Sequence, residues 1–455
     1  MVLLVACAPS NPAPPARSPT PVASSAPASL SGSTGGAQYR IEVPPGWNGT
    51  LFLFSHGYVA PGRPNPAADS PSSLISSWLL DHGYAIAGSS YSSTGWAIED
   101  ALKDQMALLD LFNERFSRPK RVIAWGASLG GIITAGLVQL YPDRFAGAIP
   151  ICGVLAGAVA TWNTALDGAY AFNTLLAPNS PPYVSLVGIN GPQANLAVAR
   201  QIFNAAASTP AGQARIALVA AISDVPGWID PTKPAPAPAD YAAQEAAQAT
   251  WLSLVDLPFQ FQFRAELEAR AGGNPSWNTG VDYAHQLAIS SSSAEVAALY
   301  SAAGLDLAAD LRALNSGARI AADPNAVAYL DQYITFDGKL SVPVLTMHTI
   351  GDGLVPPQQE TAYGDAVRAA GKQDLLRQVF VNRAGHCTFS DAETITVIEA
   401  MIARLEAGSW NAPLSPANLN AIAAALGESY NRVGGFLIAP PAFENFTPGP
   451  YPRPR

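Results

Sequence analysis

The chain has 455 residues, of which 49% are hydrophobic and 13% charged, and its formal net charge is −9. The hydrophobic content excludes a fully disordered chain, and the negative charge argues against a nucleic-acid partner, because no basic surplus is available to replace phosphate counterions. Three cysteines are too few for a disulfide-built fold and too scattered for a structural zinc site, and no apolar run reaches the roughly 20 residues of a transmembrane span.

The first 36 residues have the composition of an export signal and a tether. The segment Leu4-Val5-Ala6-Cys7 matches a bacterial lipobox, in which the cysteine is lipidated after signal cleavage, so residues 1–7 are expected to be the end of a signal peptide. Residues 8–36 are mostly Pro, Ser, Ala, Thr and Gly, which favours a disordered tether. We therefore expect an exported protein, either anchored to a bacterial cell surface through Cys7 or secreted. The alternative is a disordered cytosolic tail.

From residue 37 onward, apolar runs of strand length alternate with amphipathic helical stretches. The runs are Gln38–Val43, Gly49–His56, Tyr84–Ser90, Arg121–Gly126, Phe145–Cys152, Val342–Thr349 and Leu376–Asn382. The helical stretches lie near 98–116, 129–141, 357–371 and 391–407. This alternation predicts an α/β fold with a mostly parallel sheet covered by helices on both faces. Catalytic residues are expected at the carboxyl ends of the strands.

One strand run ends in a motif typical of a catalytic serine. Arg121–Gly126 leads into Gly126-Ala127-Ser128-Leu129-Gly130-Gly131 and then into a helical stretch. In a sharp strand-to-helix turn the flanking glycines allow close strand–helix packing, and the serine projects above the sheet. Ser128 is therefore the predicted nucleophile, and the alternative is a glycine-lined packing turn.

A serine nucleophile needs a base, and the base needs a carboxylate that orients it. On a sheet of this kind they follow the serine in the order acid, then histidine. Of the five histidines, only His386 follows a strand near the end of the core, because two precede Ser128, His285 lies in a helical insertion and His348 lies inside an apolar run. Asp352, between two glycines after the run Val342–Thr349, is the predicted acid.

The second donor of an oxyanion hole is expected after the first long apolar run. That run ends in His56-Gly57-Tyr58, so the backbone amides of Tyr58 and Leu129 are the predicted oxyanion donors.

The long segment 156–338 separates the two halves of this pattern. It is rich in alanine and in helical stretches interrupted by Gly, Pro and Trp. A loop of this length must carry its own structure, so we expect a helical cap over the strand ends. The expected divisions are a first core part at 37–155, the cap at 156–338, a second core part at 339–410 and a C-terminal extension at 411–455.

The motifs Gly-Ala-Ser-Leu-Gly-Gly, Gly-Asp-Gly and Ala-Gly-His-Cys, in this order, resemble those of the α/β-hydrolase superfamily. The chain is similar to exported bacterial serine esterases with a large helical cap between the sixth and seventh strands. The resemblance implies an α/β-hydrolase fold, a Ser128–His386–Asp352 triad and acyl-enzyme chemistry. It also extends distantly to tannases and feruloyl esterases, which have a cysteine after the catalytic histidine, as Cys387 is here. Their partner cysteine precedes the serine, where this chain has Ala127.

Cys152 is the remaining candidate partner of Cys387. Both follow strands that end at the same edge of the expected sheet, so a disulfide that fixes the histidine loop is one reading. Two buried thiols are the other.

The expected function is hydrolysis of a small-molecule carboxylic ester by a serine esterase. One alternative is an aminopeptidase of the same fold, with a cap carboxylate (Asp256, Glu266, Glu268 or Asp282) that holds the substrate amine. The other is a non-catalytic binding protein on a hydrolase scaffold. No metal or organic cofactor is expected, since no cluster has ligand spacing and no phosphate-binding loop occurs. The oligomeric state stays open.

Overall fold

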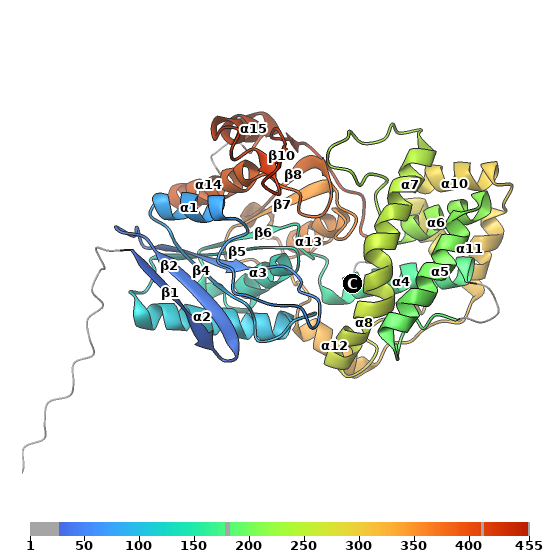
Figure 1. Ribbon diagram of the computed structural model, residues 1–455, viewed down its shortest axis with the longest axis horizontal. Helices are drawn as coiled ribbons and strands as arrows, with labels where there is room; N and C mark the ends of the chain where they lie inside the picture. The colour runs from blue at the N-terminus through green and yellow to red at the C-terminus, as the bar shows by residue number, and fades with distance from the viewer. Residues whose placement is uncertain (1–26, 178–182, 411–413, 454–455) are drawn as a thin grey trace, which may run out of the picture.

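The computed structural model describes residues 27–177, 183–410 and 414–453 (Figure 1). The lipobox with Cys7 and most of the expected tether lie outside the described residues. The central sheet has nine strands in the order β1-β2-β4-β3-β5-β6-β7-β8-β11. Their bounds are β1 Ala28–Thr34, β2 Ala37–Val43, β3 Thr50–Ser55, β4 Ala85–Ser89, β5 Arg121–Ala127, β6 Gly147–Ile151, β7 Val344–Gly351, β8 Leu376–Ala384 and β11 Phe443–Glu444.

The sheet is parallel from β4 to β8 and antiparallel at its two edges. At one edge β2 runs antiparallel to β4 and β1 antiparallel to β2; at the other, β11 runs antiparallel to β8. The predicted mostly parallel sheet is confirmed.

The prediction of a disordered tether up to residue 36 is wrong for its last part. Ala28–Thr34 forms β1, which pairs with β2 along its full length. Gly35 and Gly36 connect the two strands with positive φ angles of 61° and 93°, the conformation that two-residue hairpin turns require. Leu30 of β1 also packs against the hydrophobic core. Pairing with β2 therefore orders this segment of small residues, and β1 in turn covers the edge that β2 would otherwise expose.

Alternating side chains of the strands form two hydrophobic layers. Leu51 and Leu53 of β3 belong to one core cluster, whereas Phe52 and Phe54 belong to the other, as the two-residue period of a strand requires. The helices of the first layer are α2 Ile98–Arg115, α3 Leu129–Leu140 and α13 Gln358–Ala369. Those of the second are α1 Ser73–Asp81, α14 Asp391–Ala407 and α15 Pro416–Ala425. Helices therefore cover both faces of the sheet.

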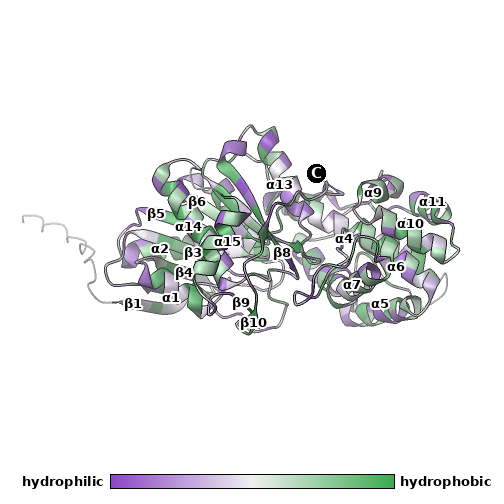
Figure 2. Cartoon of the chain, turned by 90° about the horizontal axis from the view of Figure 1, so that it is seen from above, coloured by the Kyte–Doolittle hydropathy of each residue, from purple (hydrophilic) through white to green (hydrophobic). Residues whose placement is uncertain are grey.

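A second, helical body lies between β6 and β7 in the chain and beside the sheet in space (Figures 1 and 2). Its helices are α4 Ala158–Leu176, α5 Pro192–Ala207, α6 Pro210–Ile222, α7 Tyr241–Trp251, α8 Arg264–Ala271, α9 Tyr283–Ile289, α10 Ser293–Ala302, α11 Leu307–Ser316 and α12 Pro324–Gln332. Two π-helical turns, Leu252–Asp256 and Phe259–Phe263, lie between α7 and α8. This cap has its own core, in which α6 is buried almost all round.

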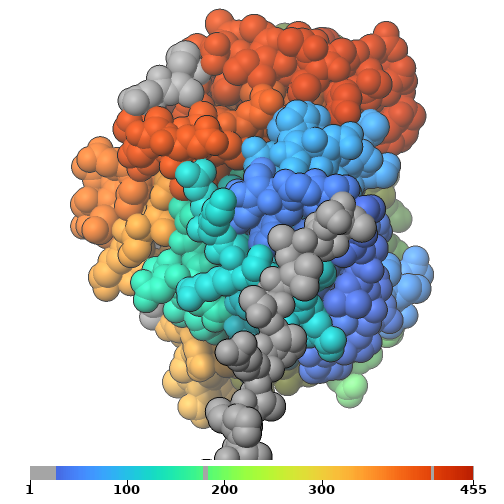
Figure 3. Space-filling view, turned by 90° about the vertical axis from the view of Figure 1, so that its left-hand side faces the viewer, coloured from blue at the N-terminus to red at the C-terminus, as the bar shows by residue number. Residues whose placement is uncertain are grey.

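The last residues join the two bodies. After α15 the chain forms a short hairpin of β9 Arg432–Val433 and β10 Leu437–Ile438, and then adds β11 to the sheet. The described part of this segment ends beside the cap, where Arg453 pairs with Asp167 of α4. On the side of the molecule opposite the cap, the coloured surface comes from the N-terminal strands, α2 and the C-terminal helices (Figure 3). Among the described residues, no helix combines the length and the apolarity that a membrane crossing needs.

Candidate active site

Ser128 occupies a strained turn between β5 and α3. Its φ and ψ angles are 61° and −124°, a region that residues with a side chain rarely adopt. The turn also passes very close to β3: a Cβ atom added at Gly126 or Gly130 would lie 2.4 Å or 1.9 Å from the carbonyl oxygen of Ser55. Only glycine fits at both positions, so the sequence motif fixes a turn that projects Ser128 beyond the end of the sheet.

Three side chains from distant parts of the chain meet at this edge of the sheet. The Nε2 atom of His386 lies 2.8 Å from the Oγ atom of Ser128, and its Nδ1 atom lies 2.7 Å from the Oδ2 atom of Asp352. Asp352 follows β7 and is fully buried, while His386 lies in the loop after β8 and is partly exposed. The structure thus brings together the three residues singled out from the sequence.

A second histidine lies behind the carboxylate of Asp352. His348 of β7 is fully buried; its Nδ1 atom lies 3.1 Å from Glu360 Oε1, and its Nε2 atom lies 2.7 Å from the Val355 carbonyl oxygen and 3.5 Å from Asp352 Oδ2. Burial alone would lower the pKa of His348, but hydrogen bonds to the two carboxylates outweigh it and raise the pKa to about 10. Burial would raise the pKa of Asp352, but His386 and His348 hold it below its ordinary value. Asp352 is therefore flanked by two imidazoles.

The loop after β3 reaches the nucleophile, as expected for Tyr58. A Cβ atom added at Gly57 would lie 3.2 Å from the Cβ atom of Ser128, so the backbone before Tyr58 passes directly beside the serine. The ring of His56 stacks on Tyr91 at 4.0 Å and contacts the carbonyl oxygen of Ser90, which fixes this loop against the end of β4. Leu129 is the first residue of α3, where backbone amides have no partner within the helix.

Core and cap enclose a cavity of about 830 Å³, open mouth included, that contains Ser128. Its walls are largely apolar: the rings of Trp96, Trp162 and Phe259 line it together with aliphatic residues of the loop after β7. Of the cap aromatics, Trp162 comes from α4 and Phe259 from the second π-helical turn. The cap therefore supplies much of the wall.

The C-terminal segment also reaches this cavity, through Tyr451. Tyr451 is 4% exposed, and its hydroxyl accepts a hydrogen bond from Gln359 Nε2 at 3.3 Å. The same Nε2 atom donates to Thr161 of α4, and the side-chain oxygen Oε1 of Gln359 accepts from the backbone amide of Ala156. Core, cap and C-terminal segment thus meet at one glutamine. Neither His348 nor Tyr451 could be singled out from the sequence, because His348 lies within an apolar run and Tyr451 in a Pro-rich tail.

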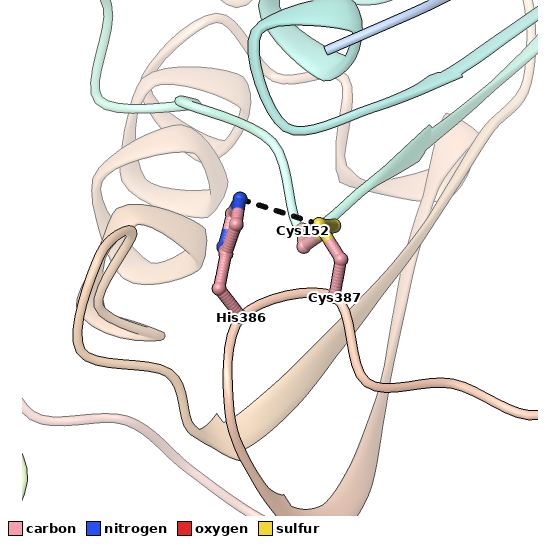
Figure 4. Close-up of side chains that lie close together, drawn as sticks. All are labelled: Cys152, His386 and Cys387. Carbon is pink, nitrogen blue, oxygen red and sulfur yellow. Dashed lines mark hydrogen bonds between the residues drawn. A yellow bond between two sulfur atoms is a disulfide. The ribbon is translucent and has the colours of Figure 1, made fainter. Parts of the chain in front are cut away.

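Cys152 and Cys387 lie next to the catalytic histidine (Figure 4). Their sulfur atoms are at bonding distance and their Cα atoms 5.5 Å apart, within the usual range for a disulfide. The Cys387 sulfur also lies 3.4 Å from His386 Nε2. The ligand atoms of these three residues lie within 4.8 Å of one another, but a disulfide would use both thiolates that a metal would need.

The four cap carboxylates considered as amine ligands differ in their surroundings. Glu266 and Glu268 each pair with an arginine of α8, at 2.8 Å and 2.9 Å, and Asp282 accepts hydrogen bonds from backbone amides at the start of α9. Asp256 alone of the four lines the cavity, and its Oδ2 atom is buried without a hydrogen-bond partner among the described residues.

Comparison of the sequence with known proteins relates the chain to a family of hydrolases. Residues 88–175, from β4 through α4 and with Ser128 among them, match the prolyl oligopeptidase family. The chain is 31% identical over 425 residues to the o-phthalyl amidase of Xanthobacter agilis, covering 86% of this chain and 89% of that protein. Among solved structures, an esterase from Aspergillus oryzae is similar at 15% identity and a TM-score of 0.40, covering 84% of this chain and 79% of that one. Feruloyl esterase B from the same organism is similar at 14% identity and a TM-score of 0.38, covering 83% and 80%.

The fold and the site agree with these relationships. A mostly parallel sheet carries the serine after β5, the aspartate after β7 and the histidine after β8, which is the chain order of α/β hydrolases. The chain is a serine hydrolase of the α/β-hydrolase superfamily, and it belongs to the family of the o-phthalyl amidase of Xanthobacter agilis.

Proposed function

We propose that the chain hydrolyses carboxylic esters through an acyl-enzyme intermediate. The observation that supports this most is the continuous contact from Ser128 Oγ through the His386 ring to the Asp352 carboxylate, at 2.8 Å and 2.7 Å. A serine in this contact can pass its proton to the imidazole as it attacks a carbonyl carbon.

In the proposed first half-reaction, the Oγ atom of Ser128 bonds to the carbonyl carbon and its proton moves to Nε2 of His386. Asp352 stabilises the imidazolium, and the backbone amides of Tyr58 and Leu129 bind the oxyanion. The intermediate collapses, the alcohol leaves with the proton from His386, and the acyl group stays on Ser128. In the second half-reaction His386 takes a proton from water as the water oxygen bonds to the acyl carbon. This second intermediate collapses: its bond to Ser128 Oγ breaks, Ser128 takes the proton back from His386, and the free acid leaves.

The cavity favours an aromatic acyl or leaving group. The rings of Trp96, Trp162 and Phe259 offer flat apolar surfaces, on which an aromatic ring gains more than an alkyl chain of the same area. Trp162 and Phe259 of the cap form part of the cavity wall, and a substrate bound against them would be shielded from water.

Amide hydrolysis is a second candidate, because the relative of 31% identity is named an amidase. A matched pair separates the two: phenyl benzoate against benzanilide, with p-nitrophenyl butyrate and an aminoacyl p-nitroanilide as further substrates. We expect kcat/KM for the ester to exceed that for the amide by more than their intrinsic reactivities explain. Hydrolysis of the anilide at a comparable kcat/KM would replace the ester proposal with the amidase one, and preference for the free-amine substrate would identify an aminopeptidase.

The third alternative, a non-catalytic binding protein, predicts no turnover of any substrate and no reaction with a fluorophosphonate.

We also propose that the protein is exported and that Cys152 and Cys387 form a disulfide, which an oxidising compartment would maintain.

A further inference from the structure

Five residues that line the same cavity as Ser128 have a buried side-chain polar atom without a hydrogen-bond partner among the described residues. Two of these atoms are the ring nitrogens Nε1 of Trp96 and Trp162, and the other three are the oxygens Oη of Tyr58, Oγ of Ser223 and Oδ2 of Asp256. Buried polar groups are nearly always paired, because an unpaired one loses its hydration without compensation. We call Tyr58, Ser223 and Asp256 the polar wall.

The polar wall is built from three separate parts of the chain. Tyr58 comes from the loop after β3, Ser223 directly follows α6, and Asp256 ends the first π-helical turn of the cap. Single π-helical turns occur often at functional sites. Three independent elements therefore place unpaired polar atoms on one cavity that is otherwise largely apolar.

A glycine of α4 makes room for part of this wall. A Cβ atom added at Gly168 would lie 2.1 Å from Ser223 Oγ and 2.9 Å from Gln260 Nε2. Ser223 and Gln260, which also lines the cavity, therefore lie side by side over this glycine. Any larger residue at 168 would displace both polar groups.

The charge of the cavity determines what the wall can bind. Among the described residues that line it, none is a lysine or an arginine, so an ionised Asp256 would have no cation beside it on this lining. Burial raises the pKa of Asp256 to about 8, and at neutral pH its carboxyl group is mostly protonated. The wall then presents three O–H groups, from a phenol, an alcohol and a carboxylic acid.

We propose, on the basis of the hydrolase function above, that the polar wall binds a neutral hydrogen-bond-accepting substituent of the substrate, such as the carbonyl oxygen of a carboxamide carried on an aromatic ring. A cationic substituent would require an ionised Asp256 in an apolar surrounding. An anionic one would find no lysine or arginine among the described lining residues to pair with. A hydrocarbon substituent would leave the three polar groups unpaired, which penalises its binding.

The test measures binding and turnover separately. Phenyl benzoates carrying a carbamoyl, methyl, carboxylate or aminomethyl substituent are prepared in two series, one with the substituent on the benzoyl ring and one on the phenol ring. Binding to S128A is measured by calorimetry, and hydrolysis is measured with the wild-type chain. We expect the carbamoyl ester to bind at least about tenfold more tightly than the methyl ester in one of the two series, and more tightly than both charged esters.

Variants of Asp256 identify the group responsible. In the S128A background, D256A should remove the carbamoyl preference, whereas D256N should keep it, because an amide N–H can still donate. E245Q is the matched control: Glu245 is a cap carboxyl with a pKa raised by burial to about 7, but it does not line the cavity.

The pH dependence gives a second readout. Between pH 7 and pH 9 the carbamoyl preference of the Asp256 protein should fall, because the ionised carboxylate no longer donates, whereas D256N should keep its preference. Burial also raises the pKa of Asp224 and Glu295 to about 7, so only the difference between the Asp256 and D256N proteins is interpreted. The phenols of Tyr58 and Tyr451, also on this cavity, have pKa values raised by burial and stay neutral over this range.

Equal affinity for the methyl and carbamoyl esters in both series would overturn the proposal. Tightest binding of the aminomethyl ester, lost in D256N, would show instead a cation site, and tightest binding of the carboxylate ester an anion site; either result also overturns it. A carbamoyl preference in S128A without turnover of any ester by the wild-type chain would support the polar wall and refute the esterase proposal.

Discussion

At the scale of single residues, a buried pair of titratable side chains, His348 and Glu360, lies next to the catalytic Asp352. His348 lies between Asp352 and Glu360, and Glu360 in turn accepts hydrogen bonds from Thr346 and Gln378, both at 2.6 Å. A carboxylate deep in a protein is costly unless it is paired. His348 therefore helps to keep Asp352 ionised, and the ionised form is the one that can stabilise an imidazolium at His386.

We expect H348Q to shift the acid limb of the kcat/KM–pH profile to higher pH. Without the imidazolium of His348, burial raises the pKa of Asp352. A larger fraction of Asp352 is then protonated at a given pH, and His386 loses its counter-charge. The activity loss should be larger at pH 6 than at pH 8. The profile is measured with p-nitrophenyl butyrate, and H285Q, which changes an exposed histidine of α9, serves as the control. A parallel loss at all pH values would indicate a structural role only.

The sequence could identify the triad residues but not His348. Ser128, Asp352 and His386 each follow a strand and adjoin a glycine, so their positions at the edge of the sheet could be inferred from local pattern. His348 lies inside β7, where the sequence shows only an apolar run. Its role depends on Glu360 of α13, and this contact follows from tertiary packing rather than from local sequence.

At the scale of elements, the loop that carries His386 lies beside the end of β6. Cys387 follows the histidine and lies at bonding distance from Cys152, 235 residues earlier. Both cysteines have positive φ angles, 54° and 42°, so the backbone is held in an unfavourable conformation at both positions. A covalent link here would fix the position of the imidazole relative to Ser128.

We expect a reducing agent to lower both kcat and the melting temperature of the wild-type chain. The reason is that the disulfide closes a long loop and its loss costs about 2–5 kcal/mol. The C152A/C387A variant should be insensitive to the same agent. If the pair is bonded, the denatured, unreduced protein has at most one thiol that reacts with Ellman's reagent. Two or more reactive thiols would contradict the disulfide.

The C-terminal segment contacts both the sheet, through β11, and the cap, through Arg453. Arg453 pairs with Asp167 of α4 at 2.8 Å and donates to the Trp277 carbonyl oxygen. Asp167 is fully buried and also accepts hydrogen bonds from Tyr283 and Gln286. A residue of the tail is thus part of a polar network in the interior of the cap.

We expect R453A to lower the free energy of unfolding by about 3 kcal/mol, because it leaves a buried carboxylate without its cation. D167N in the same chain should restore part of this loss. Urea denaturation provides the measurement. R368A, which removes an exposed ion pair with Asp365, should change stability little; an equal effect of R453A and R368A would show that the tail does not stabilise the cap.

The elements that the sequence did not predict depend on pairing with distant segments. The central strands are continuous apolar runs, and they and the helices α2, α3, α13 and α14 were predicted within a few residues. β1 is polar and gains its order from β2, and β11 has two residues and gains its order from β8. Such segments have no local signal, because the stabilising contact lies elsewhere in the chain.

At the scale of the whole molecule, several buried carboxyl groups influence how stability depends on pH. Burial raises the pKa of Asp224, Glu245 and Glu295 to about 7 and that of Asp256 to about 8. The same groups have pKa values of about 4 in an unfolded chain. Between these values the folded state binds more protons than the unfolded state, so stability falls as pH rises. His348, whose pKa of about 10 exceeds its ordinary value, extends this fall above pH 8.

We therefore expect the melting temperature to be highest near pH 5 and to decrease toward pH 8. Asp352, whose pKa is lowered in the folded state, accounts for the loss of stability at still lower pH. Scanning calorimetry at pH 5, 6.5 and 8 measures the trend, and D224N/E295Q should flatten it. A melting temperature that rises steadily from pH 5 to pH 8 would contradict the raised pKa values.

The central claim is that Ser128 is the nucleophile of a serine hydrolase, and covalent labelling tests it most directly. The intact protein is treated with a fluorophosphonate and the modified residue is located by peptide mass spectrometry, with S128A and the matched control S92A in parallel. The account predicts one adduct per chain, at Ser128, in the wild type and in S92A, and none in S128A. An adduct that persists in S128A, or a wild-type chain that does not react, would contradict it.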